Sequence, residues 1–475
     1  MSHSPLLTDL YELTMLAGYL EEGLADKPAV FDLYFRNNPF EGGYAVFAGL
    51  EPALGFLEQL RFTEDDLGFL DGLGLFKPGF IEYLRGFRFR GRVTAPPEGT
   101  LVFANEPLVT VEGTLAEAQF VETALLTIIN FQTLTATKAA RICHAANGAE
   151  VVEFGLRRAQ GPDGGLSASR AACVGGSHGS SNVLAGKLFG LPLRGTQAHS
   201  WIQAFPDELA AFRAYAETFP DSTILLVDTY DTLKSGLPNA ITVARELRER
   251  GHELRGIRID SGDLAYLSRE ARRMLDEAAF SAVKIVVSND LDEFVIESIR
   301  SEAGQVDIFA VGTKLATCSG EGGGALGGVY KLVEIDGTPK LKITGDIAKS
   351  TLPGKKRVLR CAEPGGRFIQ DVVCLVDELP QGGETVYDPT NPLRRTTLPA
   401  TARMTDLRRV VMSGGLRTTA AEALDCMANR CRGELSLLPS GCLRLINPHI
   451  YKVSISERLK CLQGSLIDEL GKKVV

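Results

Sequence analysis

The sequence predicts an α/β protein with a central barrel of parallel strands. Short β-branched apolar runs recur through the middle of the chain, and segments with helical periodicity separate them. Buried strands that alternate with amphipathic helices form parallel sheets with crossover helices. Polar residues follow directly after these runs. A barrel brings the carboxyl ends of its strands to one face, so the pattern also predicts where the functional site lies.

Five segments are apolar enough to be strands buried on both faces of a sheet. They are residues 150–154, 223–228, 256–260, 284–288 and 307–312. Two of the segments between them, residues 239–250 and 263–278, carry apolar side chains at helical spacing. The first of these ends before Gly251, a residue type that commonly terminates helices.

Polar residues capable of binding or catalysis cluster where these strands end. They include Arg157, Asp228, Arg258, Asp260, Ser288, Asn289, Asp290, Gly312, Thr313 and Lys314. In an α/β barrel all these positions meet at the same face. A doubly wound sheet is the structural alternative, and it would gather the same strand ends in a crevice.

The two ends of the chain have a different character from the middle. Residues 1–114 contain extended segments broken by Pro, Gly and Asn turns, which indicates an N-terminal α/β domain. Residues 115–146 are strongly helical and lead into the barrel, which we expect to span 115–345. Short strands and turns return after it, so residues 346–475 are expected to form a β-rich domain with terminal helices.

The composition is that of an ordinary globular protein. The chain has 475 residues, 44% of them hydrophobic and 23% charged, with a net charge of −8. Such a charge attracts neither nucleic acid nor an anionic membrane. We expect no signal peptide and no membrane span, because no apolar run approaches the roughly 20 residues that a span needs. The nine dispersed cysteines indicate reduced thiols and a cytoplasmic location.

Arg258 and Asp260 are the first candidates for chemistry. Charged residues in a buried strand are costly unless they are paired or used, and alternation points both to the same face. A guanidinium suits a carboxylate or phosphate, and the acid suits sugar hydroxyls or a magnesium ion. An internal ion pair between the two is the alternative explanation.

Several other segments have both a functional and a structural interpretation. The Gly/Ser tract 174–182 would expose backbone N–H groups to an anion at a helix start, but an ordinary turn with an N-cap is the more frequent explanation. His178 within it is expected to be structural. Residues 310–318 resemble the late-strand phosphate cradle of barrels. The basic run 354–357 is expected to be a solvated loop, with contact to phosphates as the alternative. Cys426, Cys431 and Cys442 leave a zinc site open, with ordinary thiols as the alternative.

Seven motifs in order resemble those of the nicotinate phosphoribosyltransferase family. They are TDLYELTM (8–15), EFGLRRAQGPDGG (153–165), GGSHGSSNVLAG (175–186), RGTQAHSW (194–201), IRIDSGDL (257–264), VGTKLATC (311–318) and INPHIYKVSISERL (446–459). The motifs are long and extend nearly from end to end of the chain.

The resemblance implies a reaction, a fold and an assembly. Nicotinate and phosphoribosyl pyrophosphate would give nicotinate mononucleotide and pyrophosphate, with coupled ATP hydrolysis, in NAD salvage. Such enzymes are classed as ligases and use Mg²⁺ with their phosphorylated substrates. The implied fold is the type II phosphoribosyltransferase architecture, an irregular α/β barrel with an N-terminal α/β layer. In that family two subunits of a homodimer complete each site.

The resemblance also implies roles for individual residues. Taken alone, the motif RGTQAHSW favours a satisfied core histidine at His199 over a ligand, an acid–base or a nucleophile. The resemblance instead matches His199 to the histidine that ATP phosphorylates, and imidazole is a competent acceptor because a ring nitrogen lone pair is available near neutral pH. Thr196 matches a threonine near nicotinate. Tyr11, from the neighbouring subunit, and Phe154 match the two aromatic residues that stack on the pyridine ring. Arg258 matches the arginine near the nicotinate carboxylate.

The remaining matched residues concern the phosphoribosyl donor and the choice of substrate. Asp260 is expected beside the ribose or its magnesium, Gly312 and Thr313 at the donor's phosphate, and Arg157 near the pyrophosphate. Nicotinamide-using relatives carry Asp where this chain has Ser181. An aspartate there would repel a carboxylate, so the sequence favours the acid substrate.

Two other functions are the alternatives. A quinolinate phosphoribosyltransferase needs more basic residues for two carboxylates and no phosphoacceptor histidine. A catalytically silent relative that only binds or signals would be expected to have lost some of the matched residues, whereas Tyr11, His199, Arg258 and Thr313 are all present.

Overall fold

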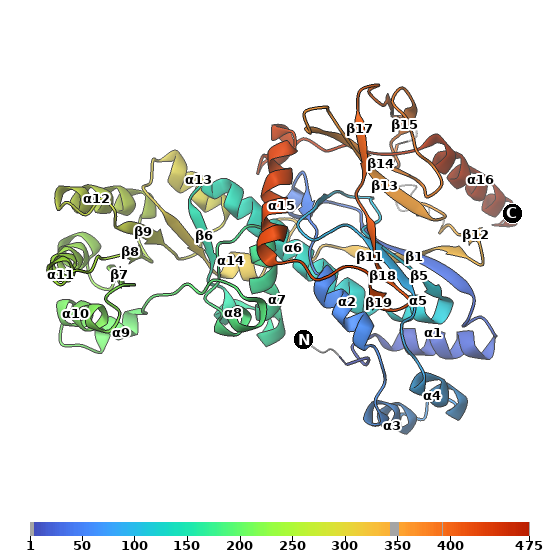
Figure 1. The fold of residues 1–475 in the computed structure, drawn as a ribbon, viewed down its shortest axis with the longest axis horizontal. Coiled ribbons are helices and arrows are strands. Elements are labelled where there is room, and N and C mark those ends of the chain that lie inside the picture. Colours follow the sequence, from blue (N-terminus) through green and yellow to red (C-terminus); the bar gives the residue numbers. More distant parts are fainter. Residues whose placement is uncertain (1–3, 343–350, 392, 475) are drawn as a thin grey trace. The chain divides into compact units, whose positions relative to one another are not determined.

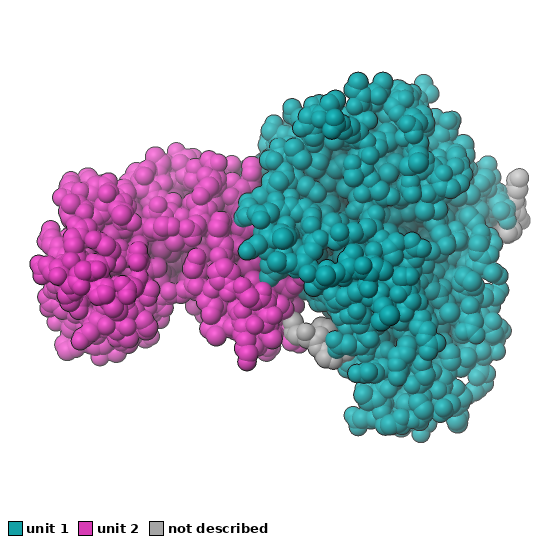
Figure 2. Space-filling model, viewed as in Figure 1, with its two compact units in different colours: residues 1–134, 325–475 teal, residues 135–324 magenta. Residues whose placement is uncertain are grey.

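A computed structural model describes residues 4–342, 351–391 and 393–474, and Figure 1 shows the order of the elements. The chain forms two compact units, coloured separately in Figure 2. Unit 1 combines residues 1–134 with residues 325–475, and unit 2 comprises residues 135–324. The boundary expected between residues 345 and 346 lies outside the described residues.

Unit 2 is built on a five-stranded parallel sheet. In spatial order its strands are β6 (Glu150–Glu153), β10 (Ile308–Val311), β9 (Lys284–Val287), β8 (Gly256–Ile259) and β7 (Ile224–Leu226). All five expected strands are therefore confirmed. Their parallel pairing follows from the helical crossovers between them.

Helices connect these strands and cover the sheet of unit 2. They are α6 (Glu122–Ala146, which crosses the unit boundary), η2 (Leu156–Arg158), α7 (Gly161–Val174), α8 (Val183–Phe189), α9 (His199–Gln203), α10 (Glu208–Thr218), the π-helix η3 (Thr232–Gly236), α11 (Leu237–Glu249), α12 (Leu264–Glu277), α13 (Glu293–Ser301) and α14 (Thr313–Ala316). The two helices expected over 239–250 and 263–278 correspond to α11 and α12, and both are confirmed.

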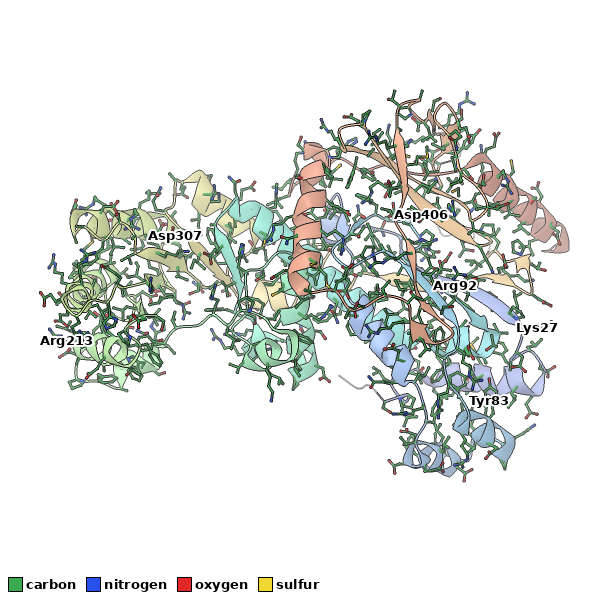
Figure 3. The ribbon with its side chains drawn as sticks, in the orientation of Figure 1. Lys27, Tyr83, Arg92, Arg213, Asp307 and Asp406 are labelled. Carbon is green, nitrogen blue, oxygen red and sulfur yellow. The ribbon has the colours of Figure 1, made fainter. Side chains whose placement is uncertain are left out.

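The row of strands curves into an irregular barrel. Single-residue parallel bridges continue it beyond β6, first to Ser180 and then to Leu193. Leu193 and Ile224, at opposite ends of this row, line the same cavity. Asp307, labelled in Figure 3, precedes β10 and accepts a 2.8 Å hydrogen bond from the backbone N–H of Ile285.

Unit 1 contains a seven-stranded antiparallel sheet that joins both ends of the chain. Its order is β12 (Thr338–Pro339), β11 (Gly328–Ile335), β1 (Pro28–Phe35), β5 (Val109–Thr114), β3 (Arg92–Ala95), β18 (Arg409–Ser413) and β19 (Leu416–Arg417). Strand β1 pairs with both β11 and β5, and β18 pairs with β3. The N-terminal layer is thus completed by strands from the second half of the sequence.

A second sheet of unit 1 confirms that the C-terminal part is rich in β structure. Its order is β16 (Arg395–Thr397), β15 (Thr385–Tyr387), β20 (Val453–Ile455), β14 (Phe368–Leu375), β13 (Lys356–Ala362) and β17 (Arg403–Asp406). A two-stranded ladder joins β2 (Ala45–Val46) to β4 (Leu101–Val102).

The helices of unit 1 lie before, between and after these strands. They are α1 (Leu10–Glu21), η1 (Pro39–Glu41), α2 (Leu50–Gln59), α3 (Glu64–Gly72), α4 (Pro78–Arg85), α5 (Leu115–Phe120), α15 (Leu424–Leu437), η5 (Ser440–Leu443) and α16 (Glu457–Val474). Among the described residues, we find no helix with both the length and the apolar character to cross a membrane.

The basic run 354–357 is not the solvated loop that its charge predicted. Strand β13 begins at Lys356, whose side chain is buried, and its Nζ lies 2.9 Å from Oδ2 of Asp32 on β1. Burial lowers the pKa of Lys356, and the carboxylate of Asp32 opposes this change. The prediction was wrong because a lysine at a strand start can be paired by an acid more than 300 residues away, which the local sequence does not reveal.

Candidate active site

Arg258 is the centre of a hydrogen-bonded cluster at the carboxyl ends of the strands of unit 2. Its Nε donates to Oγ of Ser288 at 2.8 Å, one terminal nitrogen donates to Oγ1 of Thr196 at 3.2 Å, and the other donates to Oδ1 of Asp260 at 2.9 Å. The guanidinium is thus largely buried and pre-oriented by three side chains. The internal ion pair weighed as an alternative is present, and the same pair forms part of the candidate site.

Asp260 is held by its own set of donors. Ser288 donates to its Oδ1, and its backbone N–H donates to Oδ2 of Asp228 at 2.9 Å. Ser261 also donates to this Asp228 oxygen, at 2.5 Å. Burial raises the pKa of Asp260, but the hydrogen bond from Ser288 and the positive charge of Arg258 outweigh it and hold the pKa below its usual range. The side chain is therefore a carboxylate at neutral pH.

His199, at the start of α9, faces this carboxylate. Its Nε2 lies 3.6 Å from Oδ2 of Asp260, and its Nδ1 lies 3.1 Å from Oγ1 of Thr229. The imidazole is 39% exposed, so its position is fixed on two sides while a ligand can still reach it. A satisfied core histidine, the structural explanation for this motif, would be buried.

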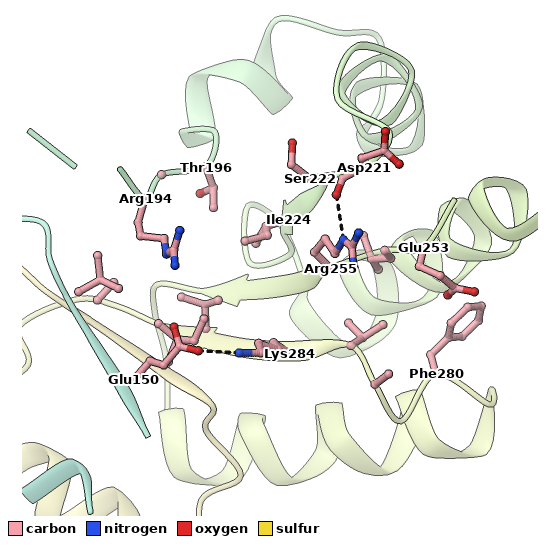
Figure 4. A pocket seen from close by; sticks show the side chains of 18 of the residues that line it. Glu150, Arg194, Thr196, Asp221, Ser222, Ile224, Glu253, Arg255, Phe280 and Lys284 are labelled. Carbon is pink, nitrogen blue, oxygen red and sulfur yellow. Dashed lines mark hydrogen bonds and ion pairs between the residues drawn. The ribbon is translucent and has the colours of Figure 1, made fainter. Parts of the chain in front are cut away.

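Phe154 lies immediately after β6, beside the arginine. The centre of the Arg258 guanidinium is 5.8 Å from the centroid of its ring. Phe154 and Thr196 line a cavity of about 750 Å³ inside unit 2. Figure 4 shows this cavity, including Thr196, Ile224 and the ion pair between Glu150 and Lys284, whose atoms are 2.7 Å apart. The cavity extends toward the amino ends of the strands, and Arg258, Asp260 and His199 are not among its lining residues. Phe154 and Thr196 therefore lie between the cavity and the Arg258 cluster.

The Gly/Ser tract is fixed against β6. The backbone N–H of Ser181 donates to the carbonyl of Glu153 at 2.9 Å, so Ser181 lies beside the strand end that leads into Phe154. Asn182 caps α8, since its Oδ1 accepts from the backbone N–H of Ala185 at 3.2 Å. His178 accepts a 3.3 Å hydrogen bond from the N–H of Val151, which supports the structural role expected for it.

Gly312 and Thr313 follow β10 and lie next to the same strand end. The N–H of Phe154 donates to the carbonyl of Val311 at 2.8 Å. A Cβ atom at Gly155 would lie 2.7 Å from the carbonyl oxygen of Gly312, so only glycine allows the two loops to approach this closely. Arg157 is exposed in the short helix η2 that follows.

Tyr11 belongs to unit 1, near the start of α1, and the other predicted site residues belong to unit 2. Its side chain is 44% exposed, and Leu7 and Leu10 beside it are exposed to 37% and 53%. Partial burial, together with the nearby carboxylate of Glu12, raises the pKa of Tyr11 to about 12. An aromatic side chain among exposed leucines is suited to contact with another molecule.

Three further residues belong to this cluster, and none of them had been assigned a specific role from the sequence. Thr229 contacts His199, Ser288 links Arg258 to Asp260, and Asp228 binds the backbone at Asp260. Ser288 and Asp228 were already noted as polar residues at strand ends, and Thr229 is the next residue along. Only Thr229 was missed, and including one more residue after each strand end would have found it.

The cysteines do not form a metal site within the part of the chain that the structure describes. All nine are free thiols, with Cys426 exposed and both Cys431 and Cys442 buried. No group of three or more His, Cys, Asp or Glu side chains suited to a metal ion is found among the described residues.

Comparisons with known proteins agree over almost the whole chain. Three family models match: the nicotinate phosphoribosyltransferase (NAPRTase) N-terminal domain over residues 6–130, the NAPRTase family over 149–363 and the nicotinate phosphoribosyltransferase C-terminal domain over 355–463. The nicotinate phosphoribosyltransferase of Bacillus subtilis is 44% identical, with 95% of this chain and 93% of that protein covered. The human protein of that name is 38% identical, with 97% and 96% covered.

The solved structures point the same way. The crystal structure of human nicotinic acid phosphoribosyltransferase superposes with a TM-score of 0.86 at 35% identity, covering 97% of this chain and 99% of that one. The nicotinate-nucleotide pyrophosphorylase of Pyrococcus furiosus, at 24% identity and a TM-score of 0.71, shares the fold. On the family matches and this identity over nearly its full length, the chain belongs to the nicotinate phosphoribosyltransferase family.

Proposed function

We propose that this protein transfers the phosphoribosyl group from phosphoribosyl pyrophosphate to nicotinate in NAD salvage, and that it couples the transfer to ATP hydrolysis through a phosphohistidine at His199. The observation that carries the proposal is the geometry of one cluster. An oriented guanidinium at Arg258 and an accessible imidazole at His199 both contact Asp260. The cluster thus combines a binding group for an anion with a nucleophile that can accept a phosphoryl group.

Nicotinate is proposed to bind with its carboxylate toward Arg258 and its ring against Phe154. A carboxylate suits a guanidinium that Ser288 and Asp260 already hold in one orientation. Thr196 adds a hydroxyl near the same edge of the ring. Ser181 is uncharged, whereas an aspartate at this position would repel the substrate carboxylate. The serine therefore favours nicotinate over nicotinamide.

The transfer itself needs little proton chemistry. The pyridine nitrogen attacks the anomeric carbon while the bond to pyrophosphate breaks, and the electron pair of that bond leaves with the pyrophosphate. No general base is needed because the nitrogen lone pair is already free, so positioning supplies most of the acceleration. Gly312 and Thr313 are proposed to hold the donor's phosphate, and Arg157 to offset charge that develops on the leaving group.

The phosphorylation step follows from how the imidazole is held. If Nδ1–H donates to Thr229, the lone pair of Nε2 is free to attack the γ-phosphorus of ATP. The Nε2–P bond forms, the bond from phosphorus to the bridging oxygen breaks, and ADP leaves. Water later hydrolyses the phosphohistidine to phosphate and regenerates the ring. An added dianion beside Asp260 changes the electrostatics at the donor site, which gives the coupling a physical basis.

The acidic residues of the cluster fit a magnesium ion carried by phosphorylated substrates. Oδ1 of Asp228 is buried without a hydrogen-bond partner, and Oδ2 of Asp260 accepts no hydrogen bond from the described residues. Carboxylate oxygens are the ligands that Mg²⁺ prefers. The two aspartates would therefore hold the ion. When bound, it would neutralise phosphate charge that otherwise faces these carboxylates.

We further propose a homodimer with shared sites, in the cytoplasm. Tyr11 would cover the nicotinate ring in the neighbouring subunit, and its exposure beside Leu7 and Leu10 is what such a contact requires. Arg36 and Lys331 of unit 1 would add positive charge from the same neighbour. Nine free thiols favour a reducing compartment.

A single assay series tests the proposal against its alternatives. ATP hydrolysis is measured alone, with nicotinate and phosphoribosyl pyrophosphate, and with quinolinate in place of nicotinate. We expect hydrolysis to increase with nicotinate and the donor, together with formation of nicotinate mononucleotide. Turnover of quinolinate without ATPase activity would instead identify a quinolinate enzyme, and the absence of any turnover would identify a silent relative.

A further inference from the structure

We propose that Glu153 is a positioning residue for nicotinate: its buried carboxylate holds Phe154 and Ser181 in place. The inference rests on the proposed function, because it takes these two residues as walls of the nicotinate pocket. Glu153 is the last residue of β6 and is fully buried, and within the described part of the chain its carboxylate has no ion-pair partner. A buried anion without a cation must be stabilised by hydrogen bonds.

Three donors converge on this carboxylate from separate segments. Oε2 accepts from the hydroxyl of Ser169 on α7 at 2.9 Å and from the hydroxyl of Ser180 at 2.6 Å. Oε1 accepts from the backbone N–H of Gly155. The side chain therefore ties together the end of β6, helix α7 and the Gly/Ser tract.

Asn182 fixes the direction of these hydrogen bonds. Its backbone N–H donates to Oγ of Ser180 at 2.9 Å, and its Nδ2 donates to Oγ of Ser169 at 3.1 Å. Both hydroxyls thus accept from Asn182 and have their single proton left to donate. Gly165 O, also 2.9 Å from the Ser169 hydroxyl, is a weaker acceptor than a carboxylate. The two hydroxyls and the N–H of Gly155 all find a partner only if both side-chain oxygens of residue 153 are hydrogen-bond acceptors, as they are in a carboxylate.

The members of this network flank the two pocket residues. Phe154 lies between Glu153 and Gly155, and Ser181 lies between Ser180 and Asn182. The backbone adds to the connection, since the N–H of Glu153 donates to the carbonyl of Gly179 at 3.0 Å and its carbonyl accepts from Ser181 at 2.9 Å. Loss of the carboxylate would therefore loosen both walls of the pocket together, while Arg258 and Asp260 keep their own contacts.

The test compares two isosteric substitutions at equally buried carboxylates of unit 2. In Glu153→Gln the amide NH₂ group is a donor. It must face either the two serine hydroxyls, which also donate, or the N–H of Gly155, so at least one donor is left without an acceptor. We expect the KM for nicotinate to rise about tenfold, because a misplacement of substrate near 1 Å is enough for effects of this size. The KM for phosphoribosyl pyrophosphate should change by less than about twofold.

Glu293→Gln is the matched control. Glu293 is also buried and pairs with Lys138 at 2.6 Å and with Arg141 at 2.9 Å, on helices α6 and α13. We expect it to lower the melting temperature and to leave the KM for nicotinate unchanged. Ser180→Ala removes one donor but keeps the carboxylate, so it should raise this KM by a smaller factor, about threefold. It keeps the test informative if Glu153→Gln does not fold.

Three results would overturn the inference. One is a folded Glu153→Gln, or Ser180→Ala where the former does not fold, with a wild-type KM for nicotinate. A second is an equal rise in KM for both substrates that merely tracks the loss in melting temperature, as expected of a structural role alone. The third comes from Phe154→Ala: an unchanged KM for nicotinate there would refute the pocket assignment and this inference with it. A raised KM in Phe154→Ala with an unchanged KM in Glu153→Gln would refute only the role of Glu153.

Discussion

The imidazole Nε2 of His199 lies 3.6 Å from the carboxylate Oδ2 of Asp260, while its other nitrogen is 3.1 Å from the hydroxyl of Thr229. A histidine held in this way between a carboxylate and a hydroxyl has a defined ring orientation. The same Asp260 side chain binds Arg258 through its second oxygen. The proposed phosphoacceptor and the proposed nicotinate ligand therefore contact the same carboxylate.

His199→Asn should lower the rate of coupled ATP hydrolysis by more than about 10³-fold, because asparagine cannot accept the phosphoryl group. Basal phosphoribosyl transfer should persist at a reduced rate, since Arg258 and Asp260 keep their contacts. Both activities are measured on the folded variant, with His252→Asn as control, a histidine paired with Asp221 at 2.9 Å. Retention of full ATP coupling in folded His199→Asn would falsify the phosphoacceptor role, and a parallel loss of stability and of both activities would indicate a structural histidine.

Ser181→Asp should reverse part of the preference for nicotinate. A carboxylate that faces the substrate carboxylate costs several kcal/mol where both are partly buried, so kcat/KM for nicotinate should fall by at least about tenfold. The value of kcat/KM for nicotinamide should fall less than that for nicotinate, or should rise. Ser181→Asn is the control of nearly equal size without charge. If the aspartate variant kept the full preference for nicotinate, the assignment of this position would be wrong.

Mixing two inactive variants tests whether Tyr11 serves the neighbouring subunit. Tyr11→Ala and Arg258→Ala chains should each form inactive dimers, whereas a mixed dimer has one site with neither defect. Random exchange between two-fold dimers then restores about one quarter of the wild-type activity. Subunit exchange is demonstrated by co-purification of differently tagged chains. With exchange established, no recovery would place Tyr11 in its own chain's site or leave it structural.

Glu12, next to Tyr11 on α1, should make stability depend on pH. Its side chain is buried and accepts a 2.9 Å hydrogen bond from Gln119, near a second carboxylate at Glu122. Burial raises the pKa of Glu12 to about 7, although the bond from Gln119 opposes this. The folded state then binds a proton that the unfolded chain, with a pKa of about 4.3, has released, so stability falls as the pH rises between these two values.

The substitution Glu12→Gln removes this dependence, because an amide carries no charge to bury. The free energy of unfolding of the variant, relative to that of the wild type, should increase by at least about 1 kcal/mol between about pH 4.3 and pH 7. Above that range the difference should be constant. Denaturant unfolding at several pH values measures the difference. Glu22→Gln, at the exposed end of the same helix, controls for the loss of a carboxylate. A difference independent of pH across this range would contradict the prediction.

The sequence by itself determined the parallel sheet and most of the candidate cluster. Strands β6 to β10 are short apolar runs, and burial on both faces leaves a local signature that needs no knowledge of distant contacts. The polar residues after them, including Arg258 and Asp260, were predicted to meet because parallel strands place their carboxyl ends at one face. The seven motifs along the chain indicated the family, and the one around His199 suggested the role proposed for its imidazole.

Only the tertiary structure decided which groups bond to one another and which distant strands pair. The contact of Thr229 with His199, the convergence of Ser169 and Ser180 on Glu153, and the pairing of β1 with β11 and of β3 with β18 join segments from 16 to more than 300 residues apart. The pairing of antiparallel strands depends on side chains on the partner strand, and a hydroxyl or carboxylate has no partner preference in its local sequence. The energy of such contacts exists only once the chain has folded, so local patterns do not encode them individually.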